Sequence, residues 1–469
     1  MRAVLALVLL ASFFVLAVAL AGGLTALAVW RFSLGDVESG VWLLVFAVAL
    51  GGPALWATVL ALFARPRPGG FGMSREDHPE LWRHVDELAR LAGTRGPDDI
   101  RLVDGANASV WERRGERYLE LGLPLVAGLG VGELRSVLAH ELGHYGGGHT
   151  RLSSLTYRAK IALELSVRGD RAFGVLSAWA HLYALVSASE SRDHERFADE
   201  VAVAAAGRGA AQRALLRIGP VGEAWGDYLA NYVSLAVVAG RTPPLLDGFR
   251  SYLGHPRRVH DLRDLERELA EREPTSVFDS HPPVRERVAA MAASTGADAP
   301  IDDRPGWTLL SGVPAQAMSS LLGLAGPPAT WAELARLGGP AHLRRHADAL
   351  RHAGRVSKVG TRLTDVLAAL ERGELLELTG APVDGSLTRE QIRETAVETV
   401  TELLGCLVTD ELVTADRATP ELNWGGLFVL RLPDGAALHP DDLVAPSVRD
   451  AGRVPELRGR LREIGFDGL

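Results

Sequence analysis

The sequence predicts a mostly α-helical protein of the α+β class, with two N-terminal transmembrane helices, a central domain with a small β-sheet, and an α-rich C-terminal accessory domain. The first 64 residues are almost uncharged, whereas the rest of the chain has the mixed composition of globular proteins. Two segments that contain several Pro and Gly residues are typical of linkers. We therefore expect five segments, namely residues 1–64, a linker at 65–72, a domain at 73–293, a second linker at 294–306, and the accessory domain at 307–469.

The N-terminal segment contains two uncharged runs, Ala3–Trp30 and Val41–Ala64. Each run exceeds the ~20 residues that a helix needs to cross the hydrocarbon layer. A cleaved signal peptide is the alternative for the first run, but this run is longer than a typical signal core and a second span follows at once. Two retained spans are therefore the favoured interpretation.

Basic residues beside the two runs predict their orientation. Arg2 precedes the first run and Arg65, Arg67 and Arg75 follow the second, whereas the loop between them holds only Arg31. Because basic residues concentrate on the cytoplasmic side, both termini of the hairpin are expected in the cytoplasm.

Periodicity predicts several elements of the central domain. We expect an amphipathic helix at Pro79–Ala92, a strand pair at Ile100–Val103 and Arg117–Leu121, and a helix from about Gly132 to Gly146. A longer helical stretch follows from Ser153 to Ser189. Its apolar centre at 172–188 is at the lower length limit for a membrane span, so packing on the core or lying at the interface is favoured over crossing.

The C-terminal region has a soluble and mostly helical composition. Leu375–Leu378 and Leu427–Leu432 are predicted as short strands. Thr388 with Gln391 has the spacing of a capping box that opens a helix. The single cysteine, Cys406, lies in that helix and is interpreted as a small buried hydrophobic residue rather than part of a disulfide framework. A net charge of −8 without a dense arginine stripe argues against nucleic-acid binding.

The strongest chemical signal is the segment His140-Glu141-Leu142-Gly143-His144. Residues four apart project from one side of a helix, so the two imidazoles can reach a single Zn²⁺ ion at ~2.0–2.1 Å. Glu141 is placed to touch a zinc-activated water without ligating the metal and is the candidate general base. The alternative, a surface helix with two chance histidines, is disfavoured by the apolar face of the segment.

A third zinc ligand must come from elsewhere in the chain. A histidine six residues after His144 would give one known pattern, but position 150 is Thr and His149 is one residue early. A carboxylate on a later helix is the other route. Glu195 and Asp199 are four residues apart and share a helix face, so Glu195 can bind zinc while Asp199 orients a motif histidine.

The ordered motifs HELGHYGGGH, ERFAD and SHPPVRERVAAM resemble those of the HtpX-like membrane zinc metallopeptidases, which are related to the CAAX prenyl proteases. The resemblance covers the N-terminal spans to about Met291 and implies a zincin-type, gluzincin-like catalytic domain. It also implies that Glu195 completes the zinc site. Because the CAAX enzymes have many more spans, prenylated substrates are not expected. Residues 294–469 have no counterpart in this resemblance.

The resemblance implies roles for four further residues. Asn107 would lie on an edge strand that pairs with an extended substrate, where it holds the substrate or the developing oxyanion. His281 is the other candidate donor to that oxyanion. Arg287 falls on a basic position of the family and His149 on a frequent histidine, and both are expected to brace the fold.

Other histidines are interpreted as structural. His342 and His346 repeat the four-residue spacing, but two arginines lie between them, so a solvated basic helix face is favoured over a metal site. His352 lies nearby on the same stretch. His181, in an apolar helical run, is expected to be a buried side chain with its polar atoms satisfied.

We therefore expect a multi-pass protein of a bacterial plasma membrane, with one Zn²⁺ per chain and its catalytic domain in the cytoplasm. It would hydrolyse peptide bonds within polypeptides that are membrane-associated or misfolded. The alternatives are an exopeptidase or narrow-specificity processing enzyme with the same chemistry, and a regulatory scaffold with a structural zinc. A structural zinc site has no need for Glu141, which argues against the scaffold.

Overall fold

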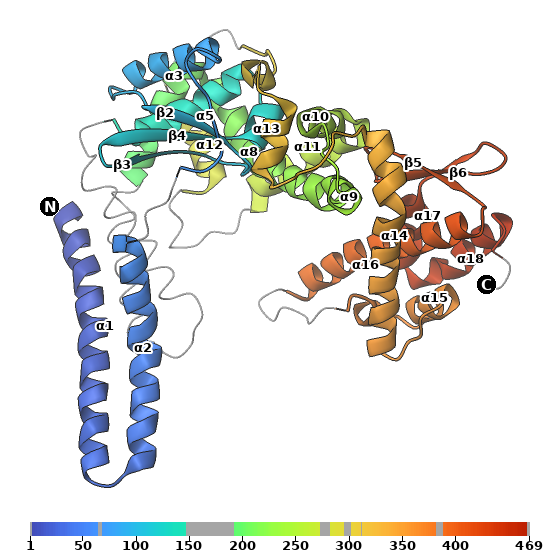
Figure 1. The fold of residues 1–469 in the computed structure, drawn as a ribbon, viewed down its shortest axis with the longest axis horizontal. Helices are drawn as coiled ribbons and strands as arrows, with labels where there is room; N and C mark the ends of the chain where they lie inside the picture. The colour runs from blue at the N-terminus through green and yellow to red at the C-terminus, as the bar shows by residue number, and fades with distance from the viewer. Residues whose placement is uncertain are drawn as a thin grey trace. The chain divides into compact units, whose positions relative to one another are not determined.

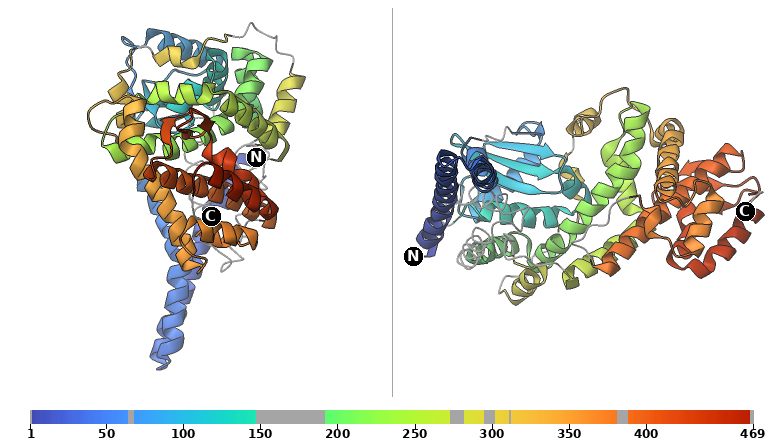
Figure 2. Two further views of the ribbon diagram at one scale, coloured as in Figure 1. Left: turned by 90° about the vertical axis from the view of Figure 1, so that its right-hand side faces the viewer. Right: turned by 90° about the horizontal axis from the view of Figure 1, so that it is seen from below.

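The computed structural model describes residues 2–63, 68–146, 192–272, 282–294, 302–310, 312–380 and 388–466, and shows a mostly helical protein with two small sheets (Figures 1 and 2). Contacts divide the chain into two compact units. The first comprises Met1–Gly222 with Arg263–Gly312, and the second comprises Glu223–Leu262 with Val313–Leu469.

The two N-terminal runs form helices α1 (Arg2–Ser33) and α2 (Val37–Phe63), which lie side by side and are joined by a tight turn (Figure 1). Gly35 has a φ of +79° in this turn, a conformation that glycine adopts without steric strain. Across the residues whose side chains the structure describes, no helix is found that is both long and apolar enough to cross a membrane. The helices are confirmed, and membrane crossing stays a prediction.

The first unit contains a four-stranded mixed sheet in the order β1-β2-β4-β3. Strand β2 pairs in parallel with β4, and β3 pairs antiparallel with β4 across a two-residue turn. Arg114 and Gly115 have φ values of +55° and +90° in this turn, which matches the right-handed twist of a hairpin. The strands are β1 (Phe71–Gly72), β2 (Asp99–Val103), β3 (Ala108–Arg113) and β4 (Glu116–Gly122).

Helices pack against this sheet and against each other. The amphipathic helix predicted from the sequence is confirmed as α3 (Pro79–Leu91), whose buried face includes Leu81, Val85 and Leu88. It packs on α5 (Val131–Gly143), which also contacts β3. The described part of the unit is completed by a helix over 192–206 and by the elements α4 (Leu123–Gly128), α8 (Arg208–Tyr228), α11 (Pro256–Arg272), α12 (Val284–Ala293) and the 3₁₀ turn η2 (Gly306–Leu310). Helices α8 and α11 continue into the second unit.

Residues 302–310 pack against the first unit and bury Gly306, Leu309 and Leu310, although the sequence suggested a linker over 294–306. The amides of Val131 and Gly132 donate to the carbonyls of Arg304 and Asp302, at 2.8 and 2.9 Å. Gly306 is buried so closely that an added Cβ would collide with the side chain of Leu134. This segment therefore caps the N-terminus of α5, satisfying donors that a helix end leaves open.

The second unit is built around the long helices α14 (Trp331–Val356) and α16 (Arg389–Thr414), which pack together (Figures 1 and 2). The predicted capping box is confirmed, because Thr388 Oγ1 accepts from the Gln391 amide at 3.3 Å and Gln391 Oε1 accepts from the Thr388 amide at 2.9 Å. The remaining helical elements are η1 (Leu229–Val233), α9 (Ser234–Ala239), α10 (Leu245–Gly254), α13 (Ala315–Leu321), α15 (Leu363–Glu371), α17 (Pro440–Arg449), η4 (Ala451–Arg453) and α18 (Val454–Glu463).

A three-stranded antiparallel sheet, β5-β6-β7, also belongs to the second unit. Its strands are β5 (Thr419–Leu422), β6 (Phe428–Arg431) and β7 (Ala437–Leu438), so the strand predicted at Leu427–Leu432 is confirmed. The strand predicted at Leu375–Leu378 is wrong, because these residues form a short 3₁₀ helix, η3 (Leu376–Leu378). A four-residue apolar run cannot distinguish the two structures by its periodicity.

The division into compact units differs from the segments expected from the sequence. Residues 223–262 pack with the C-terminal residues, although they lie inside the domain expected at 73–293. The aromatic side chains of Tyr228, Tyr232, Phe249, Tyr252, Trp331 and Trp424 form one cluster in the second unit. This cluster explains the difference, because it joins the middle of the chain to the C-terminal region.

Candidate metal centre

Helix α5 presents the two histidines of the motif at its C-terminal end. Its other side is held in the core by Leu134, Leu138 and Leu142, which are almost fully buried. His140 lies in the last turn and His144 is the residue after the helix, still in a helical conformation at φ −61° and ψ −18°. The four-residue spacing therefore places both histidines on one side of the helix, where they face one another.

The two imidazoles meet through their Nε2 atoms, which are 3.1 Å apart. Glu195, on the helix over 192–206, brings Oε2 to 3.6 Å from His140 Nε2 and Oε1 to 3.6 Å from His144 Nε2. Atoms that surround a tetrahedral zinc ion at ~2.0–2.1 Å lie about 3.3 Å from one another. The three side chains thus present donors at the mutual distances of zinc ligands, and His140 and Glu195 are buried.

A glycine lets the two ligand-bearing helices approach. A Cβ added at Gly143 would lie 3.0 Å from Ala198 Cα and 3.3 Å from Ala198 Cβ. Gly143 precedes His144, and Ala198 lies three residues after Glu195. Helix α5 and the helix over 192–206 therefore cross beside the side chains that could bind a metal. A larger side chain at either position would push Glu195 away from the histidines.

Asp199 and Arg287 both contact the ring of His140. Asp199 Oδ1 lies 3.1 Å from His140 Nδ1, which leaves Nε2 as the nitrogen that faces the metal position. The guanidinium of Arg287, from α12, donates to both carboxylate oxygens of Asp199 at 2.6 and 3.0 Å. Burial opposes ionisation of Asp199, but the hydrogen bonds from His140 and Arg287 outweigh it and lower its pKa to about 2. This anionic partner fixes the tautomer and orientation of a ligand histidine.

The charges of the cluster also suit a divalent cation. Burial acts to lower the pKa of Arg287, but the carboxylates of Asp199, Glu195 and Glu141 together raise it. Three carboxylates thus surround one guanidinium in a largely buried site. Because an excess of negative charge is costly in a buried site, a bound Zn²⁺ ion would stabilise the cluster.

Of the remaining predicted residues, the structure describes some and not others. Glu141 is partly exposed between the two histidines, as a base that meets water requires. Asn107 is exposed immediately before β3, and its carbonyl accepts from the Gly122 amide at 2.8 Å. His281 and His149 lie outside the described residues, as do His181 and the rest of the apolar stretch at 172–188.

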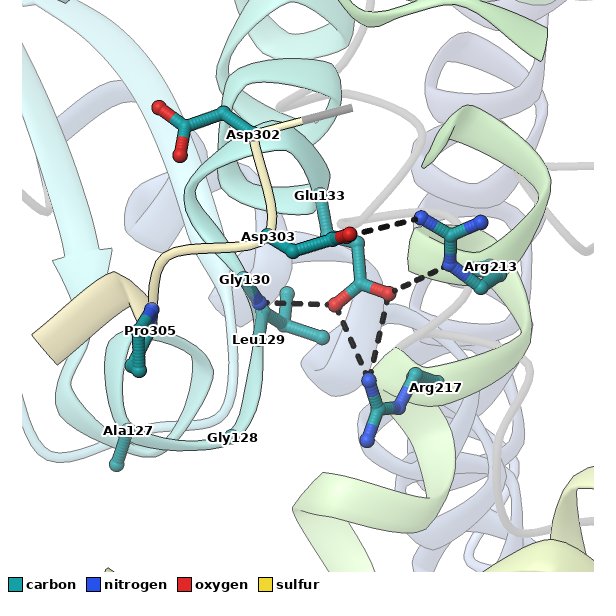
Figure 3. A pocket seen from close by; sticks show the side chains of 10 residues that line it. All are labelled: Ala127, Gly128, Leu129, Gly130, Glu133, Arg213, Arg217, Asp302, Asp303 and Pro305. Carbon is teal, nitrogen blue, oxygen red and sulfur yellow. Dashed lines mark hydrogen bonds and ion pairs between the residues drawn. The ribbon is translucent and has the colours of Figure 1, made fainter. Parts of the chain in front are cut away.

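A polar cavity of about 270 Å³ lies at the opposite end of α5 from the histidines, and sequence reasoning missed the cluster that lines it (Figure 3). There Glu133 accepts from the Gly130 amide at 2.9 Å and from Arg213 and Arg217, both on α8, at 3.2 and 3.3 Å. Glu133 is 5% exposed and lies seven residues before His140, about 10 Å along the axis. Glu133 fixes the start of α5, the helix that carries His140. Its position in the first turn of the predicted helix is the sequence feature that could have indicated this role.

The solvated basic face predicted for His342 and His346 is a wrong interpretation. His342 is only 1% exposed, because α14 turns it into the interface with α9 and α16. The intervening Arg344 and Arg345 do point to solvent. The sequence shows the charges beside the histidines but does not show which face of α14 the neighbouring helices cover.

Two histidines and a glutamate from crossing helices, with a further glutamate beside them, form a donor set that suits the zinc centre of a metallopeptidase. Residues 75–295 match the profile of peptidase family M48, a family of zinc-dependent metallopeptidases, and this match supports assigning that region of the chain to the family. The family resemblance, the hydrolase activity and the zinc cofactor predicted from the sequence are thereby confirmed. Comparison with curated proteins and comparison with solved structures each gave no match.

Proposed function

We propose that this protein is a membrane-anchored zinc endopeptidase of a bacterial plasma membrane, which cuts membrane-associated or misfolded proteins at the cytoplasmic face. The observation that carries the catalytic part is the convergence of His140, His144 and Glu195 beside Glu141. Zinc bound there supplies Lewis acidity and lowers the pKa of water to about 7.

The chain's own residues supply the proton transfers. Glu141 takes a proton from the attacking water and later gives it to the amide nitrogen as the carbon–nitrogen bond breaks. Asp199 and Arg287 keep His140 in the tautomer that directs Nε2 at the metal position. Asn107 and His281 are the proposed donors to the oxygen that gains negative charge during attack.

Strand β3 is the proposed binding site for an extended substrate. It is an edge strand of the sheet and, among the described strands, pairs only with β4. It also contacts α5, the helix that carries the histidines. An extended peptide paired with this edge would gain main-chain hydrogen bonds with little dependence on sequence, which suits a protease of unfolded segments.

The exposed surface of the N-terminal hairpin supports membrane anchoring. Large apolar side chains stand on it at exposures that core packing does not produce, with Val15 at 68%, Val18 at 63%, Trp42 at 58% and Val48 at 70%. An apolar surface of this kind is unfavourable in water and favourable in lipid. We infer that the described faces of α1 and α2 contact the bilayer.

A reporter enzyme that is active only outside the cytoplasm tests this topology. Attached after Gly70, it is expected to give no signal, because the basic residues flanking the hairpin favour a cytoplasmic location for both ends. The same reporter attached in the loop at Gly35 is the matched control and is expected to be active. Strong activity after Gly70 would reverse the proposed topology.

A further inference from the structure

A second cluster of potential metal ligands lies in the other compact unit, between α14 and α16. His342 and His346 come from successive turns of α14, and Cys406 comes from the facing side of α16. One ligand atom from each of the three lies within 4.8 Å of the others. Two helices packed side by side thus bring two imidazoles and one thiol to a common point, independently of the peptidase centre.

Both imidazoles have their Nδ1 atoms engaged elsewhere. His346 Nδ1 lies 2.9 Å from the His342 carbonyl, to which it donates. His342 Nδ1 lies 3.2 Å from Ser234 Oγ. Because this hydroxyl already donates to the Asn231 carbonyl at 3.0 Å, it accepts from His342. Each ring therefore keeps Nε2 as its unprotonated nitrogen, the arrangement that second-layer hydrogen bonds give to metal-binding histidines.

The surroundings are acidic, which favours a cation. The carboxylates of Glu402, Asp441 and Asp410 all interact electrostatically with Cys406. Glu402 lies one turn before Cys406 on α16 and places Oε1 at 3.6 Å from His346 Nε2. His342 is only 1% exposed, so this donor is shielded from solvent.

We propose that His342, His346 and Cys406 form a second metal site, which takes a borderline-soft divalent transition metal such as Zn²⁺. Glu402 is half-exposed at the edge of the cluster, and its side chain would have to turn toward the three donors to supply a fourth ligand. Imidazole, thiolate and carboxylate ligands are all common at tetrahedral zinc. Binding displaces the thiol proton of Cys406 to solvent and forms the sulfur–metal bond, with no change of oxidation state. The ion would tie α14 to α16.

The unique cysteine gives this site its own spectroscopic signature. Cys406 is the single cysteine of the chain, and the peptidase centre has no sulfur ligand. The full-length Glu141→Gln protein, stripped of metal and titrated with Co²⁺, is therefore expected to show a thiolate-to-cobalt charge-transfer band from this site alone. Added Zn²⁺ should remove the band. His346→Gln, which keeps the thiol, should weaken the band at least tenfold at equal Co²⁺.

Metal content provides the second measurement. Two zinc ions per chain are expected in the parent protein, and one in Cys406→Ala and in His346→Gln. His352→Gln is the matched control, because His352 is exposed on the same helix, and it should retain two ions and the cobalt band. Thermal unfolding identifies any variant that has lost the fold. A parent protein with one zinc ion and no cobalt–thiolate band would overturn the proposal, as would a band of full strength in a folded His346→Gln protein.

Discussion

Replacing Glu141 with glutamine is expected to abolish peptide hydrolysis while zinc stays bound. The substitution keeps the size of the side chain but removes the carboxylate that accepts a proton from the attacking water. Losing a general base costs ~10²–10⁴-fold in rate. Zinc should remain, because the donor atoms come from His140, His144 and Glu195. Cleavage of an unfolded protein such as casein, measured with metal content on the same preparation, checks both parts.

The matched control for this variant is Glu200→Gln, which removes a carboxylate from an exposed position on the helix over 192–206. It should cleave casein at close to the parent rate. Near-normal turnover by Glu141→Gln would show that another group takes the proton, and the assignment of Glu141 would be wrong.

Replacing Glu195 with glutamine is expected to weaken zinc binding more than replacing Asp199 with asparagine. Its two carboxylate oxygens each lie 3.6 Å from a ligand nitrogen, and the side chain is buried. Glutamine keeps the volume but removes the anionic donor. Asp199→Asn changes the partner of His140 rather than a ligand, so it should weaken zinc affinity by only about 10–100-fold. Competition with a chelator of known affinity compares the two variants.

The test is which of the two variants loses more zinc affinity. A Glu195→Gln protein that holds zinc more tightly than Asp199→Asn would mean that another residue completes the site. Both variants should still unfold cooperatively. The variant that binds less zinc should unfold at the lower temperature, because a ligand that binds only the native state stabilises it.

The helix that carries His140 and His144 could be predicted from the sequence because its signals are local. Leu134, Leu138 and Leu142 recur at helical spacing, and they are the residues that hold α5 in the core. The assignment of Glu195 needed more, because Glu195 lies far along the chain from His144 and no local periodicity connects them. The order of the motifs supplied this assignment, and the distances from Glu195 to the two histidines agree with it.

Features that depend on long-range packing could not be predicted in the same way. Periodicity did not predict strand β3, and only the family resemblance implied an edge strand there. Its short sequence mixes apolar and charged residues, and its positive-φ turn at Arg114 and Gly115 lacks the usual Asn-Gly signal. Residues 302–306 have the composition of a linker, yet their carbonyls accept the first amides of α5. The burial of His342 depends on which helices cover α14, and that information lies in residues distant in sequence.

The most direct test of the account is cleavage of casein by the purified full-length protein before zinc removal, after it, and after zinc is added back. Because His140, His144 and Glu195 present donors to one ion beside the proposed general base Glu141, activity should disappear with the metal and return with Zn²⁺. The Glu141→Gln protein should stay inactive throughout. Cleavage that continues undiminished in metal-free protein would contradict the central claim that this chain is a zinc peptidase.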